Sequence, residues 1–253
     1  MKLRFLGTGT STGVPQIGCD CAVCSSKDPR DHRLRTSALL DTDTGERILI
    51  DCGPDFRQQM LPLPFRRIDS VLITHEHYDH VGGLDDLRPF CAYGDVPLYA
   101  DAFTVGHIRQ RMPYCFAEHL YPGVPRIPLH MVEPGIPFQV GHTEVLPIQV
   151  MHGNLPILAY RIGSLAYITD MSVMPAESWQ LLQGVRVLVV NALRPQHHPT
   201  HQSLQEAVRF VSQIAPERAY LIHMSHHMGL HQVVDKTLPN NISLAYDTLE
   251  INV

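Results

Sequence analysis

The chain has 253 residues, of which 44% are hydrophobic, and a formal net charge of -5 at pH 7 with neutral histidines. This length and apolar fraction suffice for one sizeable core, so we expect residues 1–253 to form a single domain. The acidic balance excludes a broad basic surface of the kind that binds nucleic acids.

Short apolar runs in the first half of the chain predict strands. They lie at 2–6, 46–53, 70–74 and 96–100, and each is bounded by polar or glycine-containing segments. No run approaches the ~20 apolar residues of a membrane helix. The apolar run in the N-terminal segment "MKLRFLGTGT" is too short for the apolar region of a signal peptide. We therefore expect a cytoplasmic protein without a membrane partner.

The second half of the chain continues this pattern. Strands are predicted at 143–150, 185–190 and 219–223, and two further runs flank Gly163-Ser164 as a hairpin. Apolar residues at helical spacing predict one amphipathic helix containing Leu204, Ala207, Val208, Val211 and Ile214. The segment 243–252 is predicted to close the chain as a hairpin. The whole pattern is mixed α/β, with enough strands for two sheets.

The segment "THEHYDHVGG" (74–83) follows a predicted strand directly and contains three of the chain's sixteen histidines. Its His-x-His-x-Asp-His pattern consists of His75, His77, Asp79 and His80. Imidazole and carboxylate are the usual ligands of zinc, manganese and iron. His75 and His77 alternate along extended backbone and project to one side, whereas Asp79 and His80 follow in a turn. The pattern favours two neighbouring metal ions over an ordinary charged turn.

Three more candidate ligands each end a predicted strand. His152, Asp170 and His223 come from distant parts of the chain, and any one alone could be an ordinary polar residue. Together they fit a shared rim at the ends of the strands. Two cations roughly 3.5–4 Å apart at such a rim can share a water and lower its pKa, which provides a bridging hydroxide for attack on a phosphodiester.

A second cluster lies near the N-terminus, where "GCDCAVC" contains Cys19, Cys21 and Cys24. In a reducing compartment cysteines are thiols or metal ligands. Three close thiolates and one further ligand would form a closed tetrahedral zinc site. The alternative is three unrelated thiols, and the spacing alone leaves the fourth ligand unknown.

The histidine pattern and its partners resemble the metallo-β-lactamase superfamily of metal-dependent hydrolases. The resemblance covers almost the whole chain and implies a four-layer αβ/βα sandwich. It implies one metal on His75, His77 and His152, and a second on Asp79, His80 and His223. Asp170 would bridge the two metals, and Asp51, after "ILID", would support the site from behind the ligands.

The loop "STGVPQIGCDCAVC" is similar to that of phosphoribosyl cyclic phosphate phosphodiesterases of the carbon–phosphorus lyase pathway. This resemblance implies a structural zinc held by Cys19, Cys21, Cys24 and a histidine three residues after His223, which is His226. His227 is the alternative. It also implies a substrate-directed role for His201, before the amphipathic helix, where phosphate is favoured at the helix N-terminus. The alternative for His201 is a helix-capping or surface histidine. His197 and His198 are weaker candidates for the same role.

We therefore expect a dinuclear-metal hydrolase of a small, cyclic or linear phosphodiester, with Asp79 and His201 as catalytic residues. The expected cofactors are two zinc, manganese or iron ions and one structural zinc. The alternatives are a tRNA 3′-end-processing endonuclease, a relative of the hydrolase-like protein of pyrroloquinoline quinone biosynthesis, and a non-catalytic metal-stabilised binding protein. Nucleic acid is not the expected partner, and the sequence leaves a homodimer open.

Overall fold

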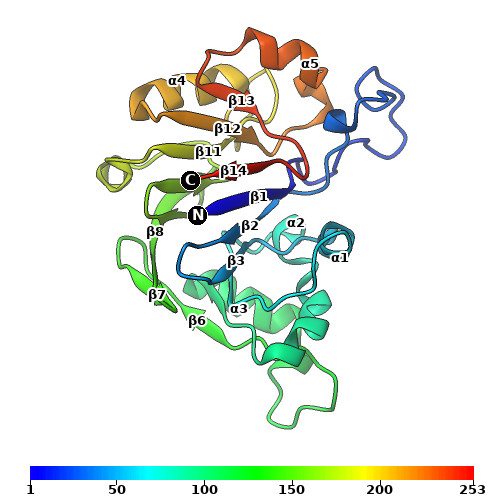
Figure 1. Cartoon of the computed structure of the whole chain (residues 1–253), viewed down its shortest axis with the longest axis vertical. Coiled ribbons are helices and arrows are strands. Elements are labelled where there is room, and N and C mark those ends of the chain that lie inside the picture. The colour runs from blue at the N-terminus through cyan, green and yellow to red at the C-terminus, as the bar shows by residue number, and fades with distance from the viewer.

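The computed structural model describes residues 1–253 and contains two seven-stranded sheets that face each other (Figure 1). The first sheet has the order β14-β1-β2-β3-β4-β5-β6. Its strands are β1 Lys2–Gly7, β2 Ser37–Asp41, β3 Arg47–Ile50, β4 Ser70–Leu72, β5 Leu98–Ala100, β6 Leu129–Met131 and β14 Glu250–Asn252.

The second sheet has the order β13-β12-β11-β10-β9-β8-β7. Its strands are β7 Phe138–Val140, β8 Thr143–His152, β9 Leu155–Ile162, β10 Leu165–Ile168, β11 Val187–Asn191, β12 Arg218–Ile222 and β13 Ile242–Leu244. β9 and β10 are antiparallel and join at Gly163-Ser164, which confirms the predicted hairpin.

Helices cover the outer faces of both sheets. Figure 1 shows α1, α2 and α3 on the side of the first sheet and α4 and α5 on the side of the second. The helices are α1 Phe56–Met60, α2 Tyr78–Val81, α3 Ala102–Arg111, α4 Leu204–Ile214 and α5 His231–Val234; the longest 3₁₀ segments are η2 Leu84–Tyr93 and η4 Ala176–Leu182. None of these helices has both the length and the apolar character needed to cross a lipid bilayer.

Three apolar layers hold the sandwich together. The central layer lies between the sheets and includes the fully buried side chains of Phe5, Tyr160 and Tyr167. One outer layer packs α1–α3 against the first sheet, and the other packs α4 against the second. Because each sheet is covered on both faces, central strands such as β10 and β11 are buried along their whole length, whereas the edge strands β6 and β14 keep exposed residues. The architecture is the four-layer αβ/βα sandwich expected from the sequence.

One prediction about the chain's end is wrong. Segment 243–252 does not form a hairpin, because its two strands belong to different sheets. β13 pairs in parallel with β12, whereas β14 pairs antiparallel with β1. The chain crosses between the sheets at Asp247, whose carboxylate accepts hydrogen bonds from the Thr8 hydroxyl and the Leu34 amide at 2.8 and 2.7 Å. Long-range contacts of the connecting residues therefore override their local turn character.

The parallel pairing of strands sets the position of the candidate site. β3 and β4 are parallel in the first sheet, and β10, β11 and β12 are parallel in the second. Carboxyl ends of parallel strands lie at one edge of a sheet, where ligands commonly bind. Asp51 follows β3, Asp170 follows β10 and His223 follows β12, so three predicted site residues emerge at strand ends.

Candidate metal centre

The structure brings all seven predicted ligands of the dinuclear site into two adjoining groups. In each group the potential ligand atoms lie within 4.8 Å of one another. The first group contains His75, His77 and His152, and the second contains Asp79, His80, Asp170 and His223. The two groups lie next to each other. The ring centroids of His75 and His80 are 4.2 Å apart, and His75 Nε2 lies 4.0 Å from Asp170 Oδ2.

Unusual backbone conformations direct several of these side chains. Asp51, Asp170 and His223 have φ values of 59°, 56° and 58°, in the left-handed region that non-glycine residues seldom adopt. Asp51 and His223 directly follow the last residue of a strand, and Asp170 comes two residues after the end of β10, so the chain turns sharply at each strand end. Such strain is held only where the surrounding structure fixes it, and it concentrates at functional sites.

The histidines of the first group present nitrogen atoms suited to a cation. Burial lowers the pKa of His75, which favours the neutral imidazole that binds metals. His152 donates a hydrogen bond from Nδ1 to the Thr200 carbonyl oxygen at 2.8 Å. This contact fixes the ring and leaves Nε2 free as a ligand, as outer hydrogen bonds to metal-binding histidines commonly do.

Asp51 lies next to the second group and holds His80 through a hydrogen bond. His80 donates from Nδ1 to Asp51 Oδ2 at 2.7 Å, and its Nε2 lies 3.2 Å from Asp79 Oδ2. Asp51 also accepts hydrogen bonds from the Thr74 amide and hydroxyl. The carboxylate therefore orients a candidate ligand without belonging to either group, which is the position that the sequence resemblance implied.

The chemistry of the donors fits divalent cations. His80 Nε2 and both ring nitrogens of His223 are buried and have no hydrogen-bond partner. Buried polar atoms are nearly always satisfied, so these orphaned nitrogens point to a missing partner. The neighbouring carboxylates of Asp79 and Asp170 are also buried. A cation would satisfy the nitrogens and compensate the carboxylates together.

Electrostatics at the second group favour positive charge. Burial alone would lower the pKa of His80, but the carboxylates of Asp79, Asp170 and Asp51 together raise it well above its usual value. Burial opposes ionisation of Asp170 as well, yet the neighbouring His223 and His80 hold the pKa of its carboxyl well below the usual range. The site thus concentrates negative charge that a metal ion can neutralise.

The cysteine loop forms a separate cluster with His226. Cys19, Cys21, Cys24 and His226 present ligand atoms within 4.8 Å of one another, and His226 Nδ1 lies 3.1 Å from Cys19 Sγ. The structure places His226, not His227, in this cluster. Hydrogen bonds from the Cys24 backbone and from His226 lower the pKa of Cys21 to about 6, so its thiolate, the form that binds metals, predominates at neutral pH.

His201 lies beside the metal groups, just before α4. Its ring centroid is 4.6 Å from that of His152 and 4.9 Å from that of His223, and its Nδ1 is buried without a partner. A capping box between Ser203 and Glu206 starts α4 and fixes this segment. Burial and the charge of His223 lower the pKa of His201 to about 3, so the ring is neutral in the free protein. Its neighbours His197 and His198 lie outside both ligand groups.

Three threonines support the site and were not identified from the sequence. Thr74 holds Asp51, Thr169 donates to Asp170 Oδ1 at 2.5 Å, and the Thr200 carbonyl holds His152. Thr74 and Thr169 directly precede candidate ligands, and Thr200 directly precedes His201. That adjacency was the available signal, but single threonines beside ligands are too common to be diagnostic.

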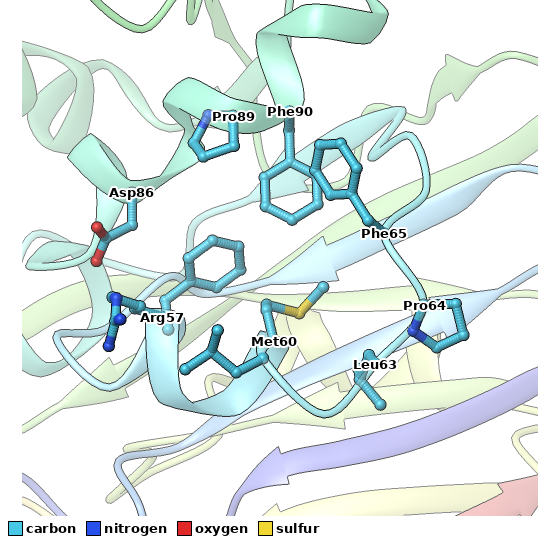
Figure 2. A pocket seen from close by; sticks show the side chains of 10 residues that line it. Arg57, Met60, Leu63, Pro64, Phe65, Asp86, Pro89 and Phe90 are labelled. Carbon is cyan, nitrogen blue, oxygen red and sulfur yellow. The ribbon is translucent and has the colours of Figure 1, made fainter.

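A separate apolar pocket lies between α1 and η2 (Figure 2). It has a volume of about 330 Å³ and is lined mainly by Phe56, Met60, Leu63, Phe65 and Phe90, with Arg57 and Asp86 at one end. None of its lining residues belongs to the metal groups. The pocket is therefore distinct from the candidate metal centre.

The family to which the chain belongs emerges from comparison with known proteins. Residues 46–224 match the model of the beta-lactamase superfamily domain, a range that includes all seven candidate ligands. An octanoyltransferase of Porphyromonas gingivalis is 49% identical over 251 residues, which cover 99% of this chain and 51% of that protein. The chain thus spans about half the length of this curated relative.

Solved structures agree with the family model. A diphosphatase from the PhnP family has a TM-score of 0.91 and 39% identity, covering 99% of this chain and 96% of that one. Zinc-bound PqqB from Methylobacterium extorquens shares the fold, with a TM-score of 0.81, 18% identity and complete coverage of both chains. Fold, site and comparisons together confirm the resemblance seen in the sequence. The chain belongs to the metallo-β-lactamase superfamily of metal-dependent hydrolases and is similar to its PhnP family.

Proposed function

We propose that the protein is a dinuclear-metal phosphodiesterase acting on a small phosphodiester. The observation that carries this proposal is that seven histidine and aspartate side chains from both sheets lie together at one edge of the sandwich, in two groups that adjoin at Asp170. Relatedness to a PhnP-family diphosphatase supports hydrolysis at phosphorus as the type of reaction.

Each group has a defined task in this proposal. His75, His77 and His152 would hold one cation, and Asp79, His80 and His223 the other, with Asp170 between them. Bound cations would supply an activated water and neutralise charge on the phosphoryl oxygens. The chain's own contribution is to fix the ligands, through Asp51 behind His80 and the Thr200 carbonyl behind His152.

His201 is proposed to contact the substrate. Its buried Nδ1 has no partner and lies 3.8 Å from Asp170 Oδ2, beside the space that the phosphoryl group would enter. A neutral ring donates a hydrogen bond to a phosphoryl oxygen. Binding of an anion beside the ring stabilises the imidazolium form and so raises the pKa of His201. The protonated ring can then donate a proton to the leaving oxygen.

The cysteine cluster is proposed to hold a structural zinc. Its four ligands join the N-terminal loop to the segment after β12. Backbone contacts continue this connection toward the catalytic groups, because the Thr10 amide donates to the carbonyl of Met224, the residue after His223, at 3.0 Å. A closed site of this type would order both segments.

Other functions are less favoured. The net charge of -5 does not favour binding of a polyanion such as tRNA. A protein that only binds a ligand would not require a complete second group of metal ligands. The octanoyl transfer named for the P. gingivalis relative is not extended to this chain, because the chain covers only about half of that protein and its donor set is that of a hydrolase.

Turnover of bis(p-nitrophenyl) phosphate tests the proposal directly. We expect manganese- or zinc-loaded protein to release nitrophenolate, and chelator-treated protein to lose this activity and regain it when metal is added. A precursor tRNA assayed alongside should remain uncut. Metal-loaded protein that releases no nitrophenolate would favour the binding role, and cleavage of the tRNA would favour the endonuclease.

The leaving group separates a proton-donating role of His201 from a structural one. We expect His201→Ala to slow hydrolysis of a 2′,3′-cyclic nucleotide, whose alkoxide needs a proton, by about 10²–10⁴-fold. Release of nitrophenolate, a good leaving group, should fall less than about tenfold. His197→Gln, which removes an exposed ring paired with Glu206, serves as control. Equal losses on both substrates would show that His201 does not act as an acid.

A further inference from the structure

His198 adjoins His201, the residue proposed to protonate the leaving oxygen. The centroids of the two rings are 5.2 Å apart, and the His201 ring lies 4.6 Å from that of the candidate ligand His152. His198 belongs to none of the ligand groups and is less deeply buried than His201. A leaving group that extends from His201 toward solvent therefore has His198 as a neighbour.

Thr200 fixes both the orientation and the tautomer of the His198 ring. The Thr200 amide donates a hydrogen bond to His198 Nδ1 at 3.3 Å, and the Thr200 hydroxyl lies 3.2 Å from the same atom. Because an amide N–H cannot accept a hydrogen bond, Nδ1 carries no proton. The ring is therefore neutral, with its proton on Nε2. This Nε2 is not fully buried and has no hydrogen-bond partner in the structure, so it is a free donor.

The same threonine connects this donor to the candidate metal ligands. The Thr200 carbonyl accepts a hydrogen bond from His152 Nδ1 at 2.8 Å. The Thr200 methyl packs on Gly153, where an added Cβ would lie 3.0 Å from Thr200 Cγ2. Gly153 has a φ of 60°, which favours glycine and permits this close approach. The His198 donor is thus held at a fixed place relative to the first metal group.

The locked tautomer of His198 suits an uncharged acceptor. An anionic acceptor would favour the imidazolium form, which requires a second proton on Nδ1. That proton would displace the hydrogen bonds from Thr200. A hydroxyl oxygen accepts a hydrogen bond from Nε2 while the contacts at Nδ1 are kept. The position beside His201 is therefore built for a neutral oxygen and not for a second anion.

We infer that His198 is a specificity-determining residue that donates a hydrogen bond from Nε2 to a hydroxyl group carried by the leaving group. This inference rests on the proposed function and names a residue that selects among its substrates. His198 takes no part in breaking the bond. Water adds to phosphorus, the leaving oxygen departs with the bonding electron pair, and His201 supplies its proton. The contact is made before and during the reaction, so it lowers KM and leaves kcat unchanged.

Two cyclic phosphodiesters that differ by one hydroxyl group test this contact. Glycerol 1,2-cyclic phosphate carries a hydroxymethyl group where propane-1,2-diol cyclic phosphate carries a methyl group, and the two have the same phosphate ring. We expect the metal-loaded wild-type protein to show a KM about two- to tenfold lower for the glycerol compound, the range expected of one neutral hydrogen bond. The two kcat values should be similar.

Two substitutions of His198 separate the donor at Nε2 from the acceptor at Nδ1. His198→Asn keeps an oxygen near the position of Nδ1 that can accept from Thr200, but its side chain is too short to reach the position of Nε2. His198→Gln reaches that position with its amide group and gives up the acceptor. We expect His198→Asn to abolish the preference for the glycerol compound and His198→Gln to retain part of it. A merely structural role predicts the reverse order.

His197→Gln is the matched control, because it replaces the neighbouring exposed histidine, which pairs with Glu206. It should leave the preference unchanged. Equal KM values for the two compounds in the wild-type protein, or equal losses on both in His198→Asn, would overturn the contact. Failure of the proposed function is a separate result, in which metal-loaded wild-type protein hydrolyses neither cyclic compound nor bis(p-nitrophenyl) phosphate. Calorimetric binding of the two cyclic compounds should then show the same difference, and equal affinities would overturn the contact.

Discussion

Asp170→Asn is expected to reduce phosphodiester hydrolysis about 10³-fold or more, equivalent to about 4 kcal/mol in the activation barrier. Asp170 is 2% exposed and lies within 3.4 Å of His80 Nε2 and 3.2 Å of His223 Nε2, so it is the carboxylate common to the site. The amide keeps the size of the side chain but removes its negative charge. Steady-state kinetics with saturating metal measure the loss, and plasma mass spectrometry should show fewer bound metals.

Asp86→Asn provides the matched control for this substitution. Asp86 is an exposed carboxylate of η2 that lines the separate apolar pocket and has no ion pair in the structure. Its replacement should leave both rate and metal content unchanged. Circular dichroism should show that both variants keep the wild-type fold. An Asp170→Asn protein that retains its metals and more than a tenth of its activity would contradict the bridging role.

Cys21→Ser is expected to remove one metal equivalent and to destabilise the protein by several kcal/mol, as loss of a structural zinc does in small domains. We expect about three metals in the intact chain and two in the variant. The Cys21 thiolate lies in the cysteine cluster, with its Sγ 3.4 Å from His226 Nδ1. Metal analysis and thermal unfolding measure the two effects.

Cys115→Ser is the control for the cysteine cluster. Cys115 is buried in the outer apolar layer under the first sheet and lies outside the cluster, so its replacement should keep all three metals. Activity of Cys21→Ser at low temperature should fall less than its stability, since the cluster shares no ligand with the catalytic groups and its backbone contact with them is at Met224. Two metals in the intact protein would rule out the cysteine zinc site.

Much of the site could be predicted because its chemistry is concentrated in short segments. The "HEHYDH" pattern brings four candidate ligands together through local spacing, and "CDCAVC" does the same for three thiols. The central strands were recognisable because both faces of each sheet are covered there, which favours continuous apolar runs such as those of β4, β10 and β11. The single residues His152, Asp170 and His223 could be proposed only because each ends such a run.

Other features depend on contacts between distant segments. The crossing of the chain between β13 and β14 replaced the predicted hairpin, since Asp247 is fixed by Thr8 and Leu34 rather than by its neighbours. No local sequence pattern predicts the left-handed backbone conformation of Asp51, Asp170 and His223.

The sequence alone determined which donor types are present and that they belong to a metal-dependent hydrolase. The tertiary structure decided that His226, not His227, completes the cysteine cluster and that Asp51 holds His80 through a hydrogen bond. The physical reason is the range of the interactions. Composition and spacing act over a few residues, whereas the site is assembled by strand pairing that joins residues far apart in the chain.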